Sequence, residues 1–190
     1  MLDRGKTGVV IPCYMVSAQI CDLIEKISDE VDIIIVVDDK CPEKSGALVE
    51  STCADPRVHV IYHENNQGVG GAILSGYQAA IEAGVDIIVK IDGDGQMDPS
   101  LIPAFISPIK CGEADYTKGN RFFGVETVRQ MPLTRLIGNI GLSFFTKLSS
   151  GYWNLFDPTN GFTAISSKVV KQLPLKKISR RYFFESDMLF

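Results

Sequence analysis

The stretch Val31-Asp-Ile-Ile-Ile-Val-Val-Asp-Asp39 decides how this chain folds. Up to Val37 its run of β-branched residues is short and apolar, which is typical of a strand buried on both faces of a parallel sheet. The run ends in two adjacent carboxylates, Asp38 and Asp39. Ligands bind parallel sheets at the carboxyl ends of the strands, so this aspartate pair marks a candidate site.

Strand and helix patterns alternate on both sides of this stretch. Short β-branched runs indicate strands, and apolar residues at helical spacing indicate helices between them. We expect strands at residues 8–13, 31–37, 58–62 and 86–91. Four helices are expected between and after them: one capped by Ser17, one at residues 43–53, one entered through Gly68 and one that starts at Pro99. This order predicts an α/β fold, Rossmann-like, with a mostly parallel sheet and helices on both faces.

The length of 190 residues is that of one domain. After about residue 111 the alternation stops, and glycine, proline and aromatic residues become frequent. We therefore expect a single domain over residues 1–190. Its first half, 1–111, forms the ligand-binding sheet, and its second half, 112–190, covers one side of the site.

Composition excludes several classes of protein. The apolar content is 45% and the charged content 22%, as in ordinary globular domains. A net charge of -4 offers nothing to attract a nucleic acid. No apolar run is long enough to cross a bilayer, and no signal peptide is recognisable at the start. These features predict a soluble cytoplasmic domain.

The cysteines and histidines do not indicate a metal centre. The five cysteines include no Cys-x-x-Cys pair, so we expect free thiols in a reducing compartment. His59 and His63 flank the strand expected at 58–62 without an evident third ligand, and we interpret them as structural or surface residues.

A second group of carboxylates follows the strand expected at 86–91, in Asp92-Gly-Asp-Gly-Gln96. Carboxylates at two strand ends of one parallel sheet meet at the same edge, where like charges repel. A divalent cation resolves this repulsion, and oxygen ligands suit Mg²⁺ or Mn²⁺ held together with a substrate phosphate. An EF-hand is excluded, because its sixth and twelfth positions would be Met97 and Pro103. A surface turn rich in Asp and Gly is the other interpretation.

The glycine run Gly68-Val-Gly-Gly-Ala-Ile73 does not match known phosphate-binding loops. Isoleucine stands where the dinucleotide motif needs its third glycine, and the Lys-Ser/Thr pair of a P-loop is absent. We expect these glycines to let a helix pack closely on the sheet beside a ligand.

The order of motifs resembles one family. Val10-Ile-Pro-Cys-Tyr14, Val37-Asp-Asp39, Asn66-Gln-Gly-Val-Gly-Gly71 and Asp92-Gly-Asp-Gly-Gln96 are followed by Gly119-Asn-Arg-Phe122 and Asp157-Pro-Thr-Asn-Gly-Phe162. This set is similar to the family-2 inverting glycosyltransferases of GT-A fold. The resembling branch contains dolichyl-phosphate mannose synthases and bacterial polyprenyl-phosphate glycosyltransferases.

The resemblance implies a nucleotide-sugar site in the first half of the chain. Pro12 and Tyr14 would border the base and ribose, and Asp38 and Asp39 would accept hydrogen bonds from the base. The implied nucleotide-binding residues are Pro12, Tyr14, Asp38, Asp39, Asp92 and Gly93. The implied ligands of Mg²⁺ or Mn²⁺ are Asp92, Asp94 and Gln96. The cation would neutralise the diphosphate leaving group.

The resemblance also implies the reaction and its acceptor. Asp94, Arg121, Arg135 and Asp187 are the implied catalytic residues. The two arginines would contact phosphate groups. A lipid phosphate is already ionised near pH 7, whereas a sugar hydroxyl needs a base. We therefore expect hexose transfer from a UDP- or GDP-sugar to a polyprenyl phosphate, with Asp187 as a base or as a support for the site.

Three alternatives stay open: transfer to a sugar hydroxyl in cell-envelope synthesis, a nucleotidyltransferase, and a non-catalytic nucleotide-binding domain. Against a nucleotidyltransferase, Cys13-Tyr-Met-Val-Ser17 lacks the basic, glycine-rich loop that such an enzyme needs. The chain stops inside an apolar helix start, so we expect a truncated C-terminus. Missing segments there would hold the full protein at the inner face of the cell membrane.

Overall fold

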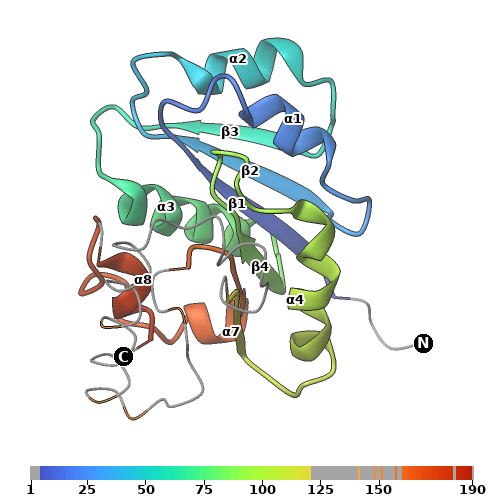
Figure 1. Cartoon of the computed structure of the whole chain (residues 1–190), viewed down its shortest axis with the longest axis vertical. Helices are drawn as coiled ribbons and strands as arrows, with labels where there is room; N and C mark the ends of the chain where they lie inside the picture. Colours follow the sequence, from blue (N-terminus) through green and yellow to red (C-terminus); the bar gives the residue numbers. More distant parts are fainter. Residues whose placement is uncertain are drawn as a thin grey trace.

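The computed structural model describes residues 5–120, 141, 148, 151, 157, 160–181 and 183–189. Strands and helices alternate along the first part of the chain (Figure 1). In chain order the elements are β1 (Thr7–Cys13), α1 (Ile20–Glu25), β2 (Ile33–Asp38), α2 (Ser45–Thr52), β3 (Val58–Tyr62), α3 (Val69–Glu82), β4 (Ile87–Lys90), the 3-10 helix η1 (Pro99–Leu101), α4 (Ile102–Lys110), β5 (Tyr116–Lys118), β6 (Thr163–Ser166), α7 (Ser167–Val170) and α8 (Phe184–Asp187). The strands and helices predicted for the first half are confirmed, with small shifts at their ends.

The described strands form one six-stranded sheet in the order β3-β2-β1-β4-β6-β5. The first four strands are parallel, with Val10 of β1 opposite Ile35 of β2 on one side and Lys90 of β4 on the other. β6 runs antiparallel to β4, and β5 runs antiparallel to β6. The sheet is mostly parallel, as predicted. Its two antiparallel additions come from the half of the chain in which no strand was expected.

Helices cover both faces of the sheet, which explains why β1 and β2 are buried along their length and apolar except at Thr7 and Asp38. On one face Val9 and Ile11 belong to a buried cluster with side chains of α1, α2 and α4. On the other face Val10 belongs to a second cluster with side chains of α3, α7 and α8. Tyr77 of α3 and Phe184 of α8 pack in a T-shaped arrangement there, with ring centroids 6.4 Å apart.

The capping role predicted for Ser17 is wrong. Its hydroxyl donates to Glu43 instead, and α1 begins later, at Ile20. The carbonyl of Val16 accepts hydrogen bonds from the N–H groups of Gln19 and Ile20, so backbone atoms close the turn that leads into the helix. A side-chain cap is not needed in this position.

The helix predicted to start at Pro99 is confirmed in the form of η1, which continues directly into α4. Asp98 caps it by accepting a 2.9 Å hydrogen bond from the N–H of Ser100. In the part of the chain that the structure describes, every helix is too short or too polar to span a membrane.

Candidate active site

A cavity of about 450 Å³ opens at the carboxyl ends of β1, β2 and β4. The end of β1 and the residues after β2 and β4 form its floor, and the start of α3 and Arg181 form its wall. Its lining residues are Pro12, Cys13, Tyr14, Val16, Asp39, Asn66, Gly68, Val69, Ala72, Asp92, Gly93, Asp94 and Arg181. This is the edge at which parallel sheets bind their ligands.

Most of the nucleotide-binding residues expected from the sequence line this cavity. The ones that do are Pro12, Tyr14, Asp39, Asp92 and Gly93, and the cavity is also lined by Asp94, which was expected as a metal ligand and catalytic residue. Asp38, Gln96 and Asp187 lie outside its lining. Arg121 and Arg135 lie outside the described residues.

Asp38 faces into the protein. It is 3% exposed, and its two carboxylate oxygens accept hydrogen bonds from the N–H groups of Cys41, at 2.6 Å, and Gly46, at 2.8 Å. A Cβ at Gly46 would lie 2.8 Å from Asp38 Oδ2, so only glycine permits this approach. Asp38 therefore holds the turn that leads into α2.

Asp39 faces the cavity and binds the two residues that lead into α3. Oδ1 accepts a 2.7 Å hydrogen bond from the N–H of Gln67, and Oδ2 accepts a 2.8 Å hydrogen bond from the N–H of Gly68. A carboxylate at the N-terminus of a helix is stabilised by the free N–H groups and by the helix dipole. The start of α3 and the end of β2 are joined in this way.

His63 supports Asp39 from behind. Its Nδ1 lies 2.7 Å from Asp39 Oδ1, and its Nε2 lies 2.9 Å from the hydroxyl oxygen of Ser75. The imidazole side chain is 6% exposed. The structural role expected for His63 is confirmed, but its contact with the aspartate was not predicted. The signal was present, because His63 directly follows β3, the strand beside β2.

Asp92 is paired with a buried lysine that sequence reasoning missed. Lys90 Nζ lies 2.7 Å from Asp92 Oδ1 and 2.9 Å from Glu185 Oε1, and the lysine side chain is 1% exposed. A buried ammonium needs such partners. Lys90 and Asp92 share a face of the strand, since side chains alternate, and a lysine inside an apolar strand was the available signal. A Cβ at Gly161 would collide with Lys90 Nζ and Asp92 Oδ2, so glycine leaves room for this pair.

Asp94 lies in the turn after β4. Its Oδ1 accepts a 3.0 Å hydrogen bond from the N–H of Gln96, and Gly95 turns the chain there with φ 71°. Asp94 lines the cavity and also a neighbouring hollow of about 340 Å³, whose wall includes Gln96. Asp92 and Asp94 thus point into the same cavity, and Gln96 lies beside it.

These residues fit a divalent cation in the chemistry of their oxygen atoms. Asp92 and Asp94 offer hard carboxylate oxygens at one side of the cavity, and Gln96 offers an amide oxygen next to them. Among the described residues, no group of three or more His, Cys, Asp and Glu side chains could hold a metal by itself. A cation here would therefore share its coordination with substrate oxygens, as Mg²⁺ commonly does.

Cys13 is the thiol in the cavity lining. Burial, and secondarily the charge of Asp38, raises the pKa of Cys13 to about 12. The thiol stays protonated near neutral pH and is a poor nucleophile. The chemistry of the cavity therefore rests on its carboxylates and on Arg181.

Asp187 lies in α8 and reaches backwards along the chain. Its Oδ2 accepts a 2.8 Å hydrogen bond from the N–H of Ser179. In the same helix, Glu185 is linked to Asp92, because both carboxylates contact Lys90 Nζ. Through this hydrogen bond Asp187 acts as a brace, that is, it holds the segment before α8 in place.

Comparison with known proteins gives a consistent result. The sequence model of the family described as glycosyl transferase family 2 matches residues 8–173. UDP-N-acetylglucosamine–dolichyl-phosphate N-acetylglucosaminyltransferase of Methanococcus voltae is 32% identical over 95% of this chain and 77% of its own length. Polyprenol monophosphomannose synthase of Mycolicibacterium smegmatis is 29% identical over 96% of this chain and 70% of its own length.

Among solved structures, glucosyl-3-phosphoglycerate synthase of Mycobacterium tuberculosis, in complex with Mn²⁺, UDP and glucosyl-3-phosphoglycerate, superposes with a TM-score of 0.72. Its sequence identity is 20%, so the likeness concerns the fold. The match covers 95% of this chain and 62% of that structure, so this chain spans less than two thirds of its neighbour.

Proposed function

Because the chain belongs to glycosyl transferase family 2, we propose that it transfers a hexose, with inversion, from a nucleotide sugar to a polyprenyl phosphate. The observation that carries this proposal is the meeting of Asp39, Asp92 and Asp94 in one cavity at the ends of three parallel strands. A base and a diphosphate can be held at opposite sides of such a cavity.

The donor is a UDP- or GDP-sugar. Pro12, Tyr14 and Asp39 form the part of the cavity that would hold the base and ribose, and Gly93 lines the same cavity, where a Cβ would lie 3.1 Å from Val16 Cγ2. Asp38 contributes by fixing the turn behind Asp39. In support, one relative is named as an enzyme of UDP-N-acetylglucosamine, and the structural neighbour was solved with UDP.

The cofactor is Mg²⁺ or Mn²⁺. Asp92, Asp94 and Gln96 would hold it, and the Mn²⁺ in the structural neighbour supports this assignment. When bound, the cation supplies Lewis-acid neutralisation of the diphosphate leaving group. Lys90 takes up one oxygen of Asp92 and so orients the carboxylate toward the cavity.

The acceptor is a lipid phosphate at the cytoplasmic face of a membrane. It needs cations to hold it rather than a base, because its phosphate is ionised near pH 7. We assign this task to Arg121 and Arg135, and we assign to Asp187 the support of the site. The names of two relatives, which include dolichyl phosphate and polyprenol monophosphomannose, support this acceptor class.

A product assay tests the proposal. Purified protein is incubated with radiolabelled UDP- or GDP-hexoses, Mn²⁺, and either a short polyprenyl phosphate or the matching polyprenol. The proposal requires label in the phosphate-linked lipid alone, and Asp29→Asn, at an exposed surface aspartate, should leave the rate unchanged. Label in the polyprenol, or in neither lipid, would contradict the polyprenyl phosphate as acceptor.

A further inference from the structure

The charges that line the cavity are unbalanced. Asp39, Asp92 and Asp94 contribute three carboxylates, and Arg181 is the one cationic side chain among the described lining residues. The ammonium of Lys90 lies behind Asp92 and does not line the cavity. A phosphate-bearing ligand therefore meets one guanidinium in the described wall.

Arg181 is brought to the cavity by a close fit between backbones. The segment 179–181, called the strap below, lies on the first turn of α3, where the N–H of Gly71 donates a 3.1 Å hydrogen bond to the carbonyl of Arg180. A Cβ at Gly68 would lie 2.6 Å from that carbonyl oxygen and 2.9 Å from Arg181 Cγ. A Cβ at Gly70 would collide with the strap backbone as well.

This fit explains the glycine run 68–71, which does not match a phosphate-binding loop. The expectation that these glycines let a helix pack closely beside a ligand is right about the closeness, but at Gly68 and Gly70 the close contact is with the strap. It is Gly76, further along α3, that lets the helix approach Val10 of the sheet. The glycines therefore fix the strap at the edge of the cavity.

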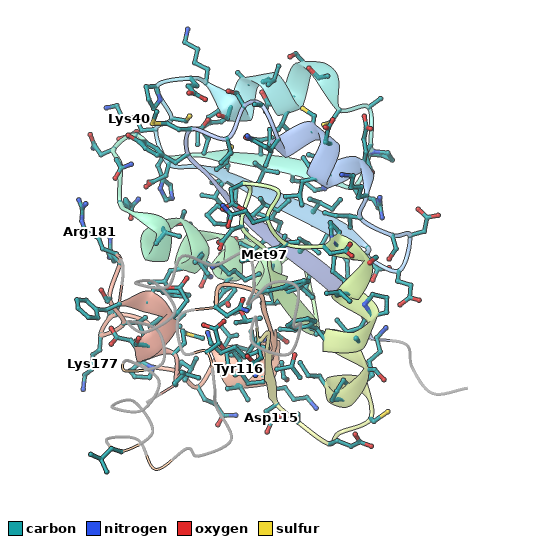
Figure 2. All side chains as sticks on the ribbon, in the orientation of Figure 1. Lys40, Met97, Asp115, Tyr116, Lys177 and Arg181 are labelled. Atoms are coloured by element: carbon teal, nitrogen blue, oxygen red, sulfur yellow. The ribbon has the colours of Figure 1, made fainter. Side chains whose placement is uncertain are left out.

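The two arginines of the strap point to different places. Arg180 Nη1 donates a 3.0 Å hydrogen bond to Gln67 Oε1 and lines a separate outer hollow. The guanidinium of Arg181 has no hydrogen bond or ion pair within the described residues, and its side chain lines the cavity. Figure 2 shows Arg181 on the strap beside α3. Arg180 thus belongs to the structure of the strap, and Arg181 is left for a ligand.

We propose that Arg181 is a phosphate-binding residue of this site, which grips a phosphate of the donor diphosphate or of the lipid acceptor. The guanidinium is planar and always charged, and it matches two phosphate oxygens with two parallel N–H donors. The inference rests on the proposed function, since that function supplies the phosphate. It adds a residue from the C-terminal part of the chain to the binding set.

Calorimetric titration of the full chain tests the proposal. Wild type, Arg181→Gln and the matched control Arg180→Gln are titrated with UDP and GDP in the presence of Mn²⁺, and with uridine and guanosine. If Arg181 grips the donor, Arg181→Gln weakens binding of the preferred diphosphate by roughly 10- to 100-fold, the effect expected for a lost charged hydrogen bond. The nucleoside affinity and the Arg180→Gln values stay unchanged.

A second measurement separates the two sources of phosphate. If Arg181 grips the acceptor, the diphosphate affinity is unchanged, and KM for a short polyprenyl phosphate rises by a similar factor in Arg181→Gln alone. If both quantities match those of Arg180→Gln, the proposal is overturned. Failure of wild type to bind either nucleotide, or to turn over, would instead contradict the proposed function, so the two failures are distinguishable.

Discussion

The buried ammonium of Lys90 lies 2.7 Å from Asp92 and 2.9 Å from Glu185, so one lysine joins the end of β4 to the C-terminal helix α8. The contact spans 95 residues of sequence between Lys90 and Glu185. The ammonium holds Asp92 Oδ1, and Asp92 still lines the cavity. Correct folding of the C-terminal part and correct placement of Asp92 are therefore coupled.

Replacement of Lys90 should show this coupling. Lys90→Met leaves Asp92 and Glu185 without their shared cation, and we expect a loss of about 3 kcal/mol in the free energy of unfolding. This value is at the low end for a broken buried ion pair, because Asp92 keeps contact with solvent. Urea unfolding measures it. Glu185→Gln, which retains an acceptor for the ammonium, is the control and should cost less; equal stability of Lys90→Met and wild type would contradict the pairing.

The contact between His63 and Asp39 makes a prediction about nucleotide affinity. His63→Ala removes a hydrogen-bond partner of Asp39 Oδ1, so the carboxylate is less firmly oriented toward the base that we propose it binds. We expect binding of the preferred nucleoside diphosphate to weaken about 10-fold, in line with the loss of a hydrogen bond to a charged group. Ser75→Ala, one step further away, should have a smaller effect in the same titration. Unchanged affinity in His63→Ala would show that Asp39 is oriented without it.

Substitutions of Asp187 distinguish between two roles for its carboxylate, a structural brace and a general base. Asparagine keeps an oxygen that can accept from the N–H of Ser179, whereas alanine does not. As a brace, Asp187→Asn should retain most of kcat, and Asp187→Ala should raise KM through displacement of the strap. As a general base, both variants would lose about 100-fold or more in kcat, the usual contribution of such a group. Steady-state kinetics with the lipid acceptor distinguishes the two patterns.

The close contact between the strap and α3 predicts the effect of adding one methyl group at Gly70. Gly70→Ala places a Cβ against the backbone of Ser179 and Arg180 and should cost about 1–3 kcal/mol by overpacking. We also expect it to reproduce the ligand-binding defect of Arg181→Gln. Gly112→Ala is the control, because a Cβ there meets open space and costs only the strain of its positive φ. A Gly70→Ala variant with wild-type ligand affinity would show that the strap does not depend on this fit.

Local patterns in the sequence were sufficient to predict the parallel strands of the sheet. The runs that became β1, β2 and β4 are short and rich in buried β-branched residues, and burial on both faces leaves little alternative for such segments, whereas the edge strand β3 is only partly buried. β5 and β6 were not predicted, because each is short and gains its stability from pairing with strands distant in sequence. The start of α1 was misplaced for a similar reason, since a backbone carbonyl took the place of the expected Ser17 cap.

The candidate site was predictable where its residues follow strands directly. Asp39, Asp92 and Asp94 belong to this group, since strand ends of a parallel sheet converge. The residues that support or complete the site come from elsewhere in the chain: Lys90 and Glu185 form one pair, and Arg181 reaches the cavity through glycine contacts. A lysine inside an apolar strand marks Lys90, but its partner Glu185 and the position of Arg181 depend on the three-dimensional approach of distant segments, which no local pattern encodes.

The most direct test of the central claim is the Mn²⁺-dependent transfer of hexose to polyprenyl phosphate by wild type and by Asp94→Asn. Asp94 is exposed, and within the described residues its side chain accepts one hydrogen bond, from the N–H of Gln96, so the variant should keep the thermal stability of wild type. We predict that transfer falls by at least about 100-fold, as expected when stabilisation of the leaving group is lost. Near-normal, Mn²⁺-dependent transfer by Asp94→Asn would contradict the assignment of this cavity as the metal-dependent glycosyltransferase site.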